Sequence, residues 1–491
     1  MSILLFQCKE KNKTNSIWLN SVKVNTFNRI QLNAMQISEI RKNQLNFYKT
    51  QKTKNIAYRK NSLKRFQSVL IDAENEIYMA LQNDLGKPEY EAFLTEYFVI
   101  LSELRLIIKN LTSWSKPIRV KSSLVNFPST DYLLPEPFGN CLQISPWNYP
   151  FQLSLATLIG AVAAGNTVVL KPSEYAPNTS SLLAKLIAKA FDPEHVTVVE
   201  GTAKEAQELL AERWDHITFT GSTKVGKIIA KAAAEHLTPT LLELGGKSPC
   251  IVDQTSPIQL TAKRIVWGKF LNCGQTCIAP DYLVVHHSIK NKLIEALKKE
   301  ITNAYGENPA ESESYGKIAY RTHFLRMQNL IDSTTPIFGG DFNENNLYFG
   351  PTLLELESID HPSMKEEIFG PILPILSYNS EDELIQIINK FEKPLGFYVF
   401  SKRNKFIKKL NDIFSYGGGV ANDSVIQFAN NNLPFGGIGH SGMGSYHGKN
   451  SFRAYTHYKP FVKRGTWIDP FIRYAPYPKS FNWLKSVLKK I

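Results

Sequence analysis

The residue with the clearest potential for covalent chemistry is Cys277. It lies in the segment LNCGQTCIAP (271–280), where small polar residues and a glycine surround the thiol. A substrate can approach such a thiol, and the thiolate is a competent nucleophile if its pKa is lowered from about 8.5 or a proton acceptor is supplied. A lone cysteine can equally be a small core residue, and the local sequence leaves both interpretations open.

A carboxylate with unusual surroundings, Glu243, lies in the apolar run LLELGGK (241–247). Its position indicates either a general base with a raised pKa or a buried ion-pair partner. Cys273 precedes Cys277 by four residues, but no His or Cys cluster supplies further ligands at zinc spacing, so we predict no metal site. No histidine stands near a Ser or Cys in the pattern of a local triad.

Two glycine-rich segments resemble nucleotide-binding motifs. Residues 437–442, GIGHSG, match G-x-G-x-x-G but follow PFG rather than a strand, so we interpret them as a loop. Residues 221–227, GSTKVGK, nearly match a P-loop, but Ile228 replaces the hydroxyl residue that would ligate magnesium. Without a magnesium ligand, the segment still consists of a strand, a tight turn and a helix N-terminus. Such a turn can bind a pyrophosphate without a metal, or it can be an ordinary strand–helix connection.

Hydrophobic periodicity predicts the elements that position these residues. Amphipathic helices are expected over 36–115 and a connecting arm over 117–139. Strands and helices then alternate, with strands at 141–145, 167–171, 196–200 and 216–220 and helices at 152–164, 179–190, 203–211 and 224–236. This alternation predicts a parallel sheet with helices on both faces and ligands at the carboxyl ends of its strands. A second α/β region is expected over 247–430, followed by an arm-like segment over 436–465.

Composition and charge exclude several classes of protein. The chain has 491 residues, 43% hydrophobic and 21% charged, and is typical of a globular protein. Its net charge of +13 is concentrated at the ends: +4 in residues 1–34, +7 in residues 459–491 and only +2 between them. A nucleic-acid groove is therefore not expected. Five scattered cysteines indicate free thiols in a reducing compartment, and the apolar stretch 153–170 indicates a core helix and strand rather than a membrane span.

The C-terminal segment differs from the body. Phe481, Leu484, Leu488 and Ile491 share one helical face, and four lysines (479, 485, 489 and 490) supply charge. A basic amphipathic helix can lie on an anionic membrane surface, or it can dock on the protein body or on a partner subunit. We expect a cytoplasmic protein with, at most, peripheral membrane contact.

Seven segments together carry a family resemblance: ISPWNYPF (144–151), VVLKPSE (168–174), FTGSTKVG (219–226), LELGGKSP (242–249), NCGQTCIAPDY (272–282), EEIFGPI (366–372) and LPFGGIGHSGMGSYHGKNSF (433–452). In this order they resemble the aldehyde dehydrogenase superfamily over residues 36–475. The last segment resembles the class 3 branch, which includes the fatty aldehyde dehydrogenases. The resemblance implies an α/β fold with a Rossmann-like cofactor domain, an α/β catalytic domain and a small β oligomerisation arm.

The resemblance also implies domain boundaries. A disordered N-terminal extension is expected over 1–35. The NAD(P)-binding domain is expected over 36–118 and 141–245, and the catalytic domain over 246–435. The oligomerisation arm would comprise 119–140 and 436–465, and the basic amphipathic tail 466–491. Class 3 relatives are usually dimers, so a homodimer is expected.

The family pattern assigns catalytic roles to three residues. Cys277 would attack the aldehyde, the Asn148 amide and the Cys277 backbone N–H would hold the oxyanion, and Glu243 would activate water to hydrolyse the thioester. The expected reaction is NAD(P)-dependent oxidation of medium- or long-chain aliphatic, or aromatic, aldehydes to acids. A coenzyme A-acylating dehydrogenase and a non-catalytic membrane-associated scaffold are the alternatives.

The remaining implied residues concern the cofactor. The turn from Gly221 to Gly226 (Ser222, Thr223, Lys224 and Val225 between them) would lie under the pyrophosphate, with Ser222 as a donor. Lys171 and Glu174 would contact the adenosine ribose, Glu367 the nicotinamide ribose, and Phe369 and Trp147 would line the nicotinamide passage. A carboxylate at Glu174 favours NAD over NADP, while dual use stays open.

Overall fold

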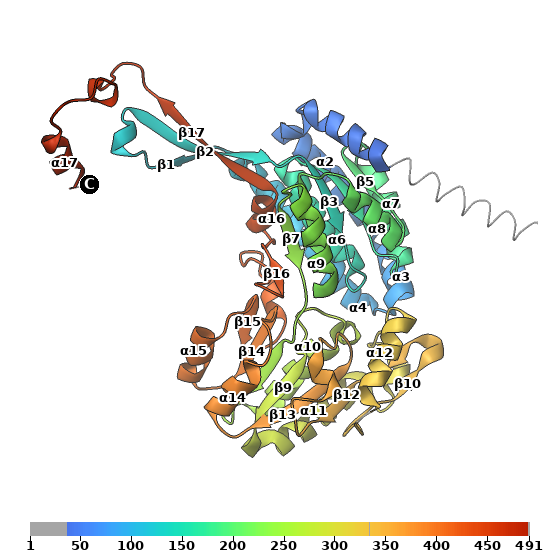
Figure 1. The fold of residues 1–491 in the computed structure, drawn as a ribbon. Coiled ribbons are helices and arrows are strands. Elements are labelled where there is room, and N and C mark those ends of the chain that lie inside the picture. The colour runs from blue at the N-terminus through green and yellow to red at the C-terminus, as the bar shows by residue number, and fades with distance from the viewer. Residues whose placement is uncertain (1–36, 333, 490–491) are drawn as a thin grey trace, which may run out of the picture. The chain divides into compact units, whose positions relative to one another are not determined.

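Two compact units make up the part of the chain that the computed structural model describes, residues 37–332 and 334–489 (Figure 1). Unit 1 contains the chain up to Trp114 together with Pro137–Thr456, and unit 2 contains Ser115–Glu136 and the chain from His457 onward. The extension predicted over 1–35 lies outside the described residues, as do residues 490 and 491 of the predicted tail.

The first sheet of unit 1 has six strands in the order β16-β7-β6-β3-β4-β5, parallel except for β16 at one edge. Its strands are β3 (Asn140–Ile144), β4 (Thr167–Lys171), β5 (Val196–Val198), β6 (His216–Thr220), β7 (Thr240–Glu243) and β16 (Gly442–Met443). The connecting helices are α6 (Pro150–Ala164), α7 (Pro177–Ala190), α8 (Ala203–Ala211) and α9 (Thr223–Glu235). The predicted alternation of strands and helices is confirmed.

Neighbouring residues on these strands pack on opposite faces of the sheet. Cys141 and Val168 belong to one hydrophobic cluster, whereas Leu142 and Val169 belong to another. A parallel sheet covered on both faces needs apolar side chains on both, which explains the continuous apolar runs in the sequence. This is the α/β fold expected from the sequence.

All 15 residues of helix α6 are buried. It begins with Pro150 at its first position, where proline costs no hydrogen bond, and it ends before Gly165, whose φ of 103° is left-handed. The predicted core helix and following strand are thus confirmed. Among the described residues, no helix combines the length and apolar composition needed to cross a bilayer.

The second sheet of unit 1 is parallel throughout, in the order β12-β13-β9-β8-β14-β15. Its strands are β8 (Pro249–Val252), β9 (Tyr282–His286), β12 (Thr352–Glu355), β13 (Ile372–Tyr378), β14 (Gly396–Phe400) and β15 (Gly418–Ala421). The associated helices are α10 (Ile258–Phe270), α11 (Lys290–Tyr305), α12 (Arg321–Ile331), α13 (Pro362–Lys365), α14 (Glu381–Ile388) and α15 (Asn404–Ile413), and β10 (Phe342–Asn343) pairs with β11 (Tyr348–Phe349).

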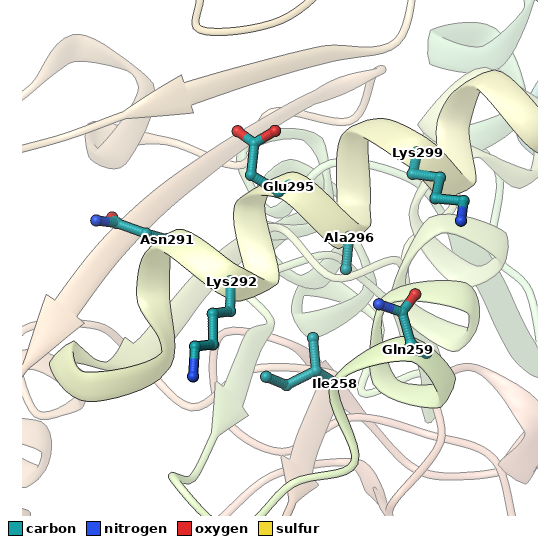
Figure 2. Close-up of a pocket in the computed structure, with 7 residues that line it drawn as sticks. All are labelled: Ile258, Gln259, Asn291, Lys292, Glu295, Ala296 and Lys299. Carbon is teal, nitrogen blue, oxygen red and sulfur yellow. The ribbon is translucent and has the colours of Figure 1, made fainter.

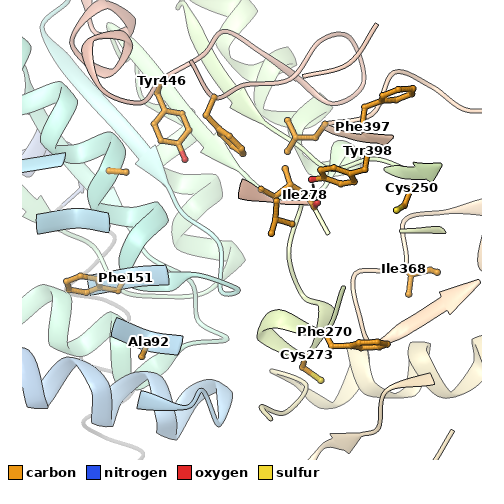
Figure 3. Packing of buried hydrophobic residues seen from close by; sticks show 14 of the residues in the cluster. Ala92, Phe151, Cys250, Phe270, Cys273, Ile278, Ile368, Phe397, Tyr398 and Tyr446 are labelled. Atoms are coloured by element: carbon orange, nitrogen blue, oxygen red, sulfur yellow. Dashed lines mark hydrogen bonds between the residues drawn. The ribbon is translucent and has the colours of Figure 1, made fainter. Parts of the chain in front are cut away.

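One continuous hydrophobic cluster includes residues from both sheets and from the helices around them. Figure 3 shows part of this cluster, including Phe151 of α6, Phe270 at the end of α10 and Tyr398 of β14. The Tyr398 hydroxyl donates a hydrogen bond to the carbonyl of Ile278, the residue after Cys277. The β14 strand is thereby tied to the segment that follows the cysteine.

The N-terminal helices of unit 1 include a π-helical segment. Residues 37–49 are helical and are followed by α2 (Ile56–Asp72), α3 (Glu74–Leu85), α4 (Glu89–Ala92), the π-helix η2 (Phe93–Tyr97) and α5 (Phe98–Trp114). Helices α2, α3, α5 and α6 pack against one another or against α7. π-Helical turns are rare overall, but those that occur are often found at functional sites.

Unit 2 is built on a three-stranded sheet in the order β1-β2-β17. Its elements are β1 (Ile118–Val120), β2 (Ser129–Pro137), β17 (Thr456–Arg464) and α17 (Asn482–Leu488). Residues 436–456 belong to unit 1. Strand β16 pairs with β7 there, and α16 (Lys449–Ala454) packs on α6, so this glycine-rich segment is held in the body. The oligomerisation arm expected at 119–140 and 436–465 stays a prediction.

Candidate active site

A strained loop between α10 and β9 carries Cys277. Asn272 and Cys273 both have a φ of 54°, in the left-handed region that costs non-glycine residues about 1–3 kcal/mol each. The next residue, Gly274, has a φ of 72°, and a Cβ there would come 2.4 Å from the Gly370 carbonyl oxygen. Such a conformation persists only where the surrounding structure holds it in place.

Amide side chains hold this loop. The Asn272 Nδ2 group donates to the carbonyls of Asn148 (2.7 Å) and Gln275 (3.2 Å). The Gln275 Nε2 group donates to the carbonyls of Asn272 (3.1 Å) and Lys317 (3.0 Å). The loop is therefore connected both to itself and to segments distant in the sequence, and the position of Cys277 is determined by these contacts.

Cys277 is half-buried as a residue, whereas Cys273 is buried with its Sγ 3.4 Å from the Tyr315 hydroxyl. Burial raises the pKa of Cys277 well above its ordinary value, and the carboxylates of Glu367 and Glu243 raise it further. The backbone N–H groups of Cys277 and Ile278 lower this pKa by a smaller amount. This raised pKa favours the protonated thiol at neutral pH. Formation of the thiolate therefore depends on a neighbouring proton acceptor and not on a lowered thiol pKa.

Glu243 ends strand β7 and is buried, with 2% of its surface exposed. Neither of its carboxylate oxygens has a hydrogen-bond partner among the described residues. Burial therefore raises the pKa of Glu243 well above its usual range. A carboxyl group with no structural partner is chemically suited to exchange protons, and for the ion-pair alternative the described part of the chain supplies no hydrogen-bonded partner.

Glu367 supplies a second carboxylate at this site. Burial, and then the charge of Asp281, raise the pKa of Glu367 to about 8. A Cβ on Gly245 would come 1.9 Å from Glu367 Oε2, so only glycine lets this carboxylate pack against the backbone. The charge of Glu367 affects the Cys277 thiol more strongly than that of Glu243, a relation that the sequence did not indicate.

Asn148 lies in the loop between β3 and α6 and is buried. Its Nδ2 group donates to the Gln275 carbonyl at 3.1 Å. An amide NH₂ has two hydrogens, so one donor remains for an oxygen formed near Cys277. The pairing of this amide with the Cys277 backbone N–H as an oxyanion hole stays a prediction.

Aromatic rings line the segment that follows Glu367. The Trp147 ring meets the rings of Tyr320, His323 and Phe369 with centroids 5.3–5.4 Å apart. Phe369 has a φ of 55°, so its ring is presented from a strained backbone. The structure thus brings Trp147 and Phe369 together, and their place beside the nicotinamide stays a prediction.

Helix α12 holds the carbonyls of this strained segment. His323 Nε2 lies 2.7 Å from the Phe369 carbonyl, and Arg326 donates to the carbonyls of Glu367 (3.1 Å) and Ile368. Sequence reasoning missed both α12 residues. No local motif could have revealed them, because side chains that bind backbone carbonyls have no characteristic spacing relative to their targets.

The predicted cofactor residues lie at the carboxyl ends of β4 and β6. Lys171 ends β4 and forms a 2.8 Å ion pair with Glu174. Ser222 begins α9 as its N-cap, and its hydroxyl accepts from the Val225 N–H at 3.4 Å. Ser222, Lys224 and Val225 are exposed, and the Thr223 hydroxyl donates to the His440 carbonyl.

Neighbouring side chains leave room only for glycine at both ends of this turn. A Cβ on Gly221 would come 2.5 Å from the Phe219 ring, and a Cβ on Gly226 would come 2.5 Å from a Leu244 methyl carbon. The result is an open turn at the start of a 13-residue helix, whose first N–H groups can meet an anion. The geometry fits the pyrophosphate of a dinucleotide.

Other features of the described residues lie apart from this site. A surface pocket between α10 and α11 is lined mostly by the apolar parts of its residues, and none of the lining residues belongs to the loop around Cys277 (Figure 2). In the parts of the chain that the structure describes, no group of three His, Cys, Asp or Glu residues could hold a metal ion.

Comparison with known proteins shows which family has this sequence and fold. The aldehyde dehydrogenase family matches residues 18–461. The chain is 44% identical to the 4,4'-diaponeurosporen-aldehyde dehydrogenase of Staphylococcus aureus, covering 90% of this chain and 97% of that protein. It is 42% identical to aldehyde dehydrogenase family 3 member A2 of Mus musculus (90% and 92% covered) and 44% identical to the dimeric NADP-preferring aldehyde dehydrogenase of Rattus norvegicus (88% and 95% covered).

Solved structures show the same similarity. The substrate-bound state of Staphylococcus aureus AldH superposes with a TM-score of 0.90 at 43% identity, covering 92% of this chain and 99% of that one. Glyceraldehyde-3-phosphate dehydrogenase GapN from Methanocaldococcus jannaschii, complexed with NADP, gives a TM-score of 0.80 at 26% identity (88% and 95% covered). The predicted α/β fold is confirmed, with one parallel sheet and one sheet that is parallel except at its β16 edge.

The proximity of Glu367 to the thiol predicts a measurable pH effect. Above about pH 8, where Glu367 is ionised, replacing it with Gln removes a negative charge that raises the Cys277 pKa, so the pH profile of Cys277 alkylation by iodoacetamide should shift to lower pH there. Alkylation of the Cys277 peptide is followed by mass spectrometry from pH 6 to pH 10. The exposed neighbour Glu366→Gln is the control and should leave the profile unchanged. A Glu367→Gln profile that stays in place or moves to higher pH would contradict the assignment.

Proposed function

The chain belongs to the aldehyde dehydrogenase family, and on this premise we propose that Cys277, Glu243 and Asn148 are the catalytic residues of its reaction. The protein is an enzyme that oxidises aldehydes to carboxylic acids with NAD(P)⁺. The observation that carries the residue assignment is the buried carboxyl of Glu243, which has no partner among the described side chains and raises the pKa of the Cys277 thiol. A coenzyme A-acylating reaction is not favoured, because a base that activates water serves hydrolysis.

The first half of the reaction forms a carbon–sulfur bond. Because the pKa values of Glu243 and Glu367 are both raised, the ionised fraction of a carboxyl group beside Cys277 takes the thiol proton, and the sulfur attacks the aldehyde carbon to give a thiohemiacetal. The Asn148 amide and the Cys277 N–H donate to the oxyanion, and removal of one such donor typically costs about 3 kcal/mol of transition-state stabilisation. Asn148 is suited to this role because its position is fixed by the bond to the Gln275 carbonyl before the substrate arrives.

The second half of the reaction releases the acid. NAD or NADP, when bound, supplies the hydride acceptor that turns the thiohemiacetal into a thioester. Glu243 takes a proton from a water molecule, the hydroxide attacks the thioester carbonyl, and the carbon–sulfur bond breaks. The carboxylic acid leaves and Cys277 regains its proton. The raised pKa of Glu243 matches a group that must both accept and return protons.

We assign the cofactor to the turn at Gly221–Gly226, with Ser222 donating to the pyrophosphate. Lys171 and Glu174 would bind the adenosine ribose, Glu367 the nicotinamide ribose, and Trp147 and Phe369 would flank the nicotinamide. Relatives of both kinds are known, since one is named NADP-preferring and another NAD-dependent. Glu174 favours NAD, but its ion pair with Lys171 offsets part of its charge, which keeps NADP accessible.

Apolar aldehydes are the proposed substrates, either medium- or long-chain aliphatic or aromatic. The rings of Trp147, Tyr320 and Phe369 provide an apolar surface beside Glu367. A relative 44% identical to the chain is named for a specific organic aldehyde, 4,4'-diaponeurosporen-aldehyde. A rim of aromatic rings favours substrates whose remainder is hydrophobic.

The first prediction from this assignment concerns turnover. With hexanal, hexadecanal and benzaldehyde, each with NAD and then NADP and without coenzyme A, the wild type should form reduced nicotinamide and free acid. Cys277→Ala should lose at least about 10⁴-fold in kcat, since the nucleophile is absent. Cys273→Ala is the matched control and should retain activity. Full activity of Cys277→Ala, or a strict need for coenzyme A, would contradict the proposal.

The second prediction concerns assembly and the basic tail. We propose a homodimer, as the name of the dimeric rat relative indicates for that protein, with the α17 segment free to contact an anionic membrane. Phe481 and Trp483 are exposed, 46% and 56%, beside Lys479 and Lys485. Deleting 479–491 should abolish binding to phosphatidylserine vesicles, with phosphatidylcholine vesicles as the control, and light scattering should still show a dimer. Unchanged vesicle binding contradicts the membrane role, and a monomeric deletion variant assigns the tail to the subunit interface.

A further inference from the structure

The start of helix α6 is capped by a side chain from another element. Its N-cap residue, Tyr149, makes no side-chain capping bond. Instead, Glu96 Oε2 accepts from the N–H groups of Phe151 and Gln152, each at 3.0 Å. Glu96 belongs to the π-helix η2 and is fully buried. A carboxylate at this position satisfies two unpaired N–H groups and complements the positive end of the helix dipole.

A buried ammonium group completes this arrangement. Lys87 Nζ lies 2.5 Å from Glu96 Oε1, and both side chains are fully buried. The same Nζ lies 4.1 Å from the centre of the Tyr149 ring. Removing one partner of such a buried pair leaves the other charge uncompensated, so each member keeps the other in place. The three residues Lys87, Glu96 and Tyr149 form one unit, which we call the α6 clamp.

The α6 clamp reaches the reactive cysteine through Tyr149. The Tyr149 hydroxyl lies 2.7 Å from Thr276 Oγ1, and Thr276 immediately precedes Cys277. On the other side, Tyr149 immediately follows Asn148, whose amide donates to the Gln275 carbonyl. Asn148 and Tyr149, which precede α6, therefore bind the two residues that precede Cys277. Both hydrogen bonds join segments about 127 residues apart in the chain.

We propose that Lys87, Glu96 and Tyr149 are positioning residues that fix the separation between the Asn148 amide and the Cys277 thiol. The inference rests on the proposed function, in which these two groups act on the same carbonyl. The clamp fixes where α6 begins, and the Tyr149–Thr276 bond aligns that start with the cysteine loop. A displacement of about 1 Å between reacting groups can cost about 100-fold in rate.

Two reagents separate the placement of the amide from the state of the thiol. Iodoacetamide alkylates Cys277 and needs only an accessible thiolate. p-Nitrophenyl acetate acylates Cys277: the sulfur attacks the ester carbonyl, the oxyanion needs its donors, and p-nitrophenolate leaves. Neither reagent requires a nicotinamide cofactor or an aldehyde. The ratio of the acylation rate to the alkylation rate therefore reports on the alignment of Asn148 with Cys277.

Tyr149→Phe is the most conservative test, because it removes only the hydroxyl and keeps the ring beside Lys87. We expect its acylation rate to fall about 10-fold while alkylation stays within about 2-fold of the wild type. Tyr455→Phe is the matched control: Tyr455 is fully buried and its hydroxyl also makes side-chain hydrogen bonds, to Gln143 and Thr218. It should leave the ratio unchanged.

A second pair of variants tests the buried carboxylate. Glu96→Gln should lower the ratio in the same direction as Tyr149→Phe. Glu103→Gln is its control, because Glu103 is a buried carboxylate on α5 that accepts from the Gly448 N–H and the Ser451 hydroxyl at the start of α16, a helix that carries no site residue. If Glu96→Gln does not fold, the Tyr149→Phe comparison still decides the matter.

The outcomes are distinct. An unchanged ratio in Tyr149→Phe, an equal fall in Tyr455→Phe, or a parallel loss of acylation and alkylation would each overturn the inference. A wild type that is alkylated but never acylated would overturn it as well. A wild type that accepts the ester and oxidises no aldehyde would instead refute the proposed function, while the variants would continue to test the positioning role.

Discussion

The burial of three acidic groups, complete for Glu243 and partial for Cys277 and Glu367, governs the rest of this structure. Burial raises the pKa of each of them, so each disfavours its own charged form. At neutral pH the protonated forms are therefore favoured, and a negative charge that develops during the reaction needs a group that stabilises it. Fixed dipoles that receive this charge are more effective here than in water, because the surrounding dielectric is low.

The architecture supplies these groups from separate elements and then fixes them. Glu243 comes from the end of β7, Asn148 from the loop before α6, and Cys277 from the loop after α10. The loops that carry Asn148 and Cys277 are not held by strand pairing or by an α-helix. Side chains bind their backbone groups instead: Asn272 and Gln275 within the cysteine loop, and Arg326 and His323 at the Glu367–Phe369 segment. The strain at Asn272, Cys273 and Phe369 is tolerated because these bonds hold it.

The sequence predicted the parts of this account that depend on local pattern. The alternation of strands and helices, the buried character of α6 and the turn at Gly221 follow from short-range periodicity and glycine spacing, and the structure has them. It could not predict contacts made by chain topology. Glu96 caps a helix that starts 54 residues later, and Tyr149 meets Thr276 across 127 residues, so no local spacing indicates either. The pairing of β16 with β7 likewise joins strands that are distant in the sequence.

The measurement that tests the central claim most directly is trapping of the thioester in Glu243→Gln. The variant is mixed with an aldehyde and NAD or NADP, and reduced nicotinamide and the mass of the Cys277 peptide are followed together. We predict a burst of about one reduced nicotinamide per site, an acyl group on Cys277 that accumulates, and little steady-state turnover. Steady turnover at the wild-type rate without an acyl adduct would contradict the role of Glu243 as the base that hydrolyses the thioester.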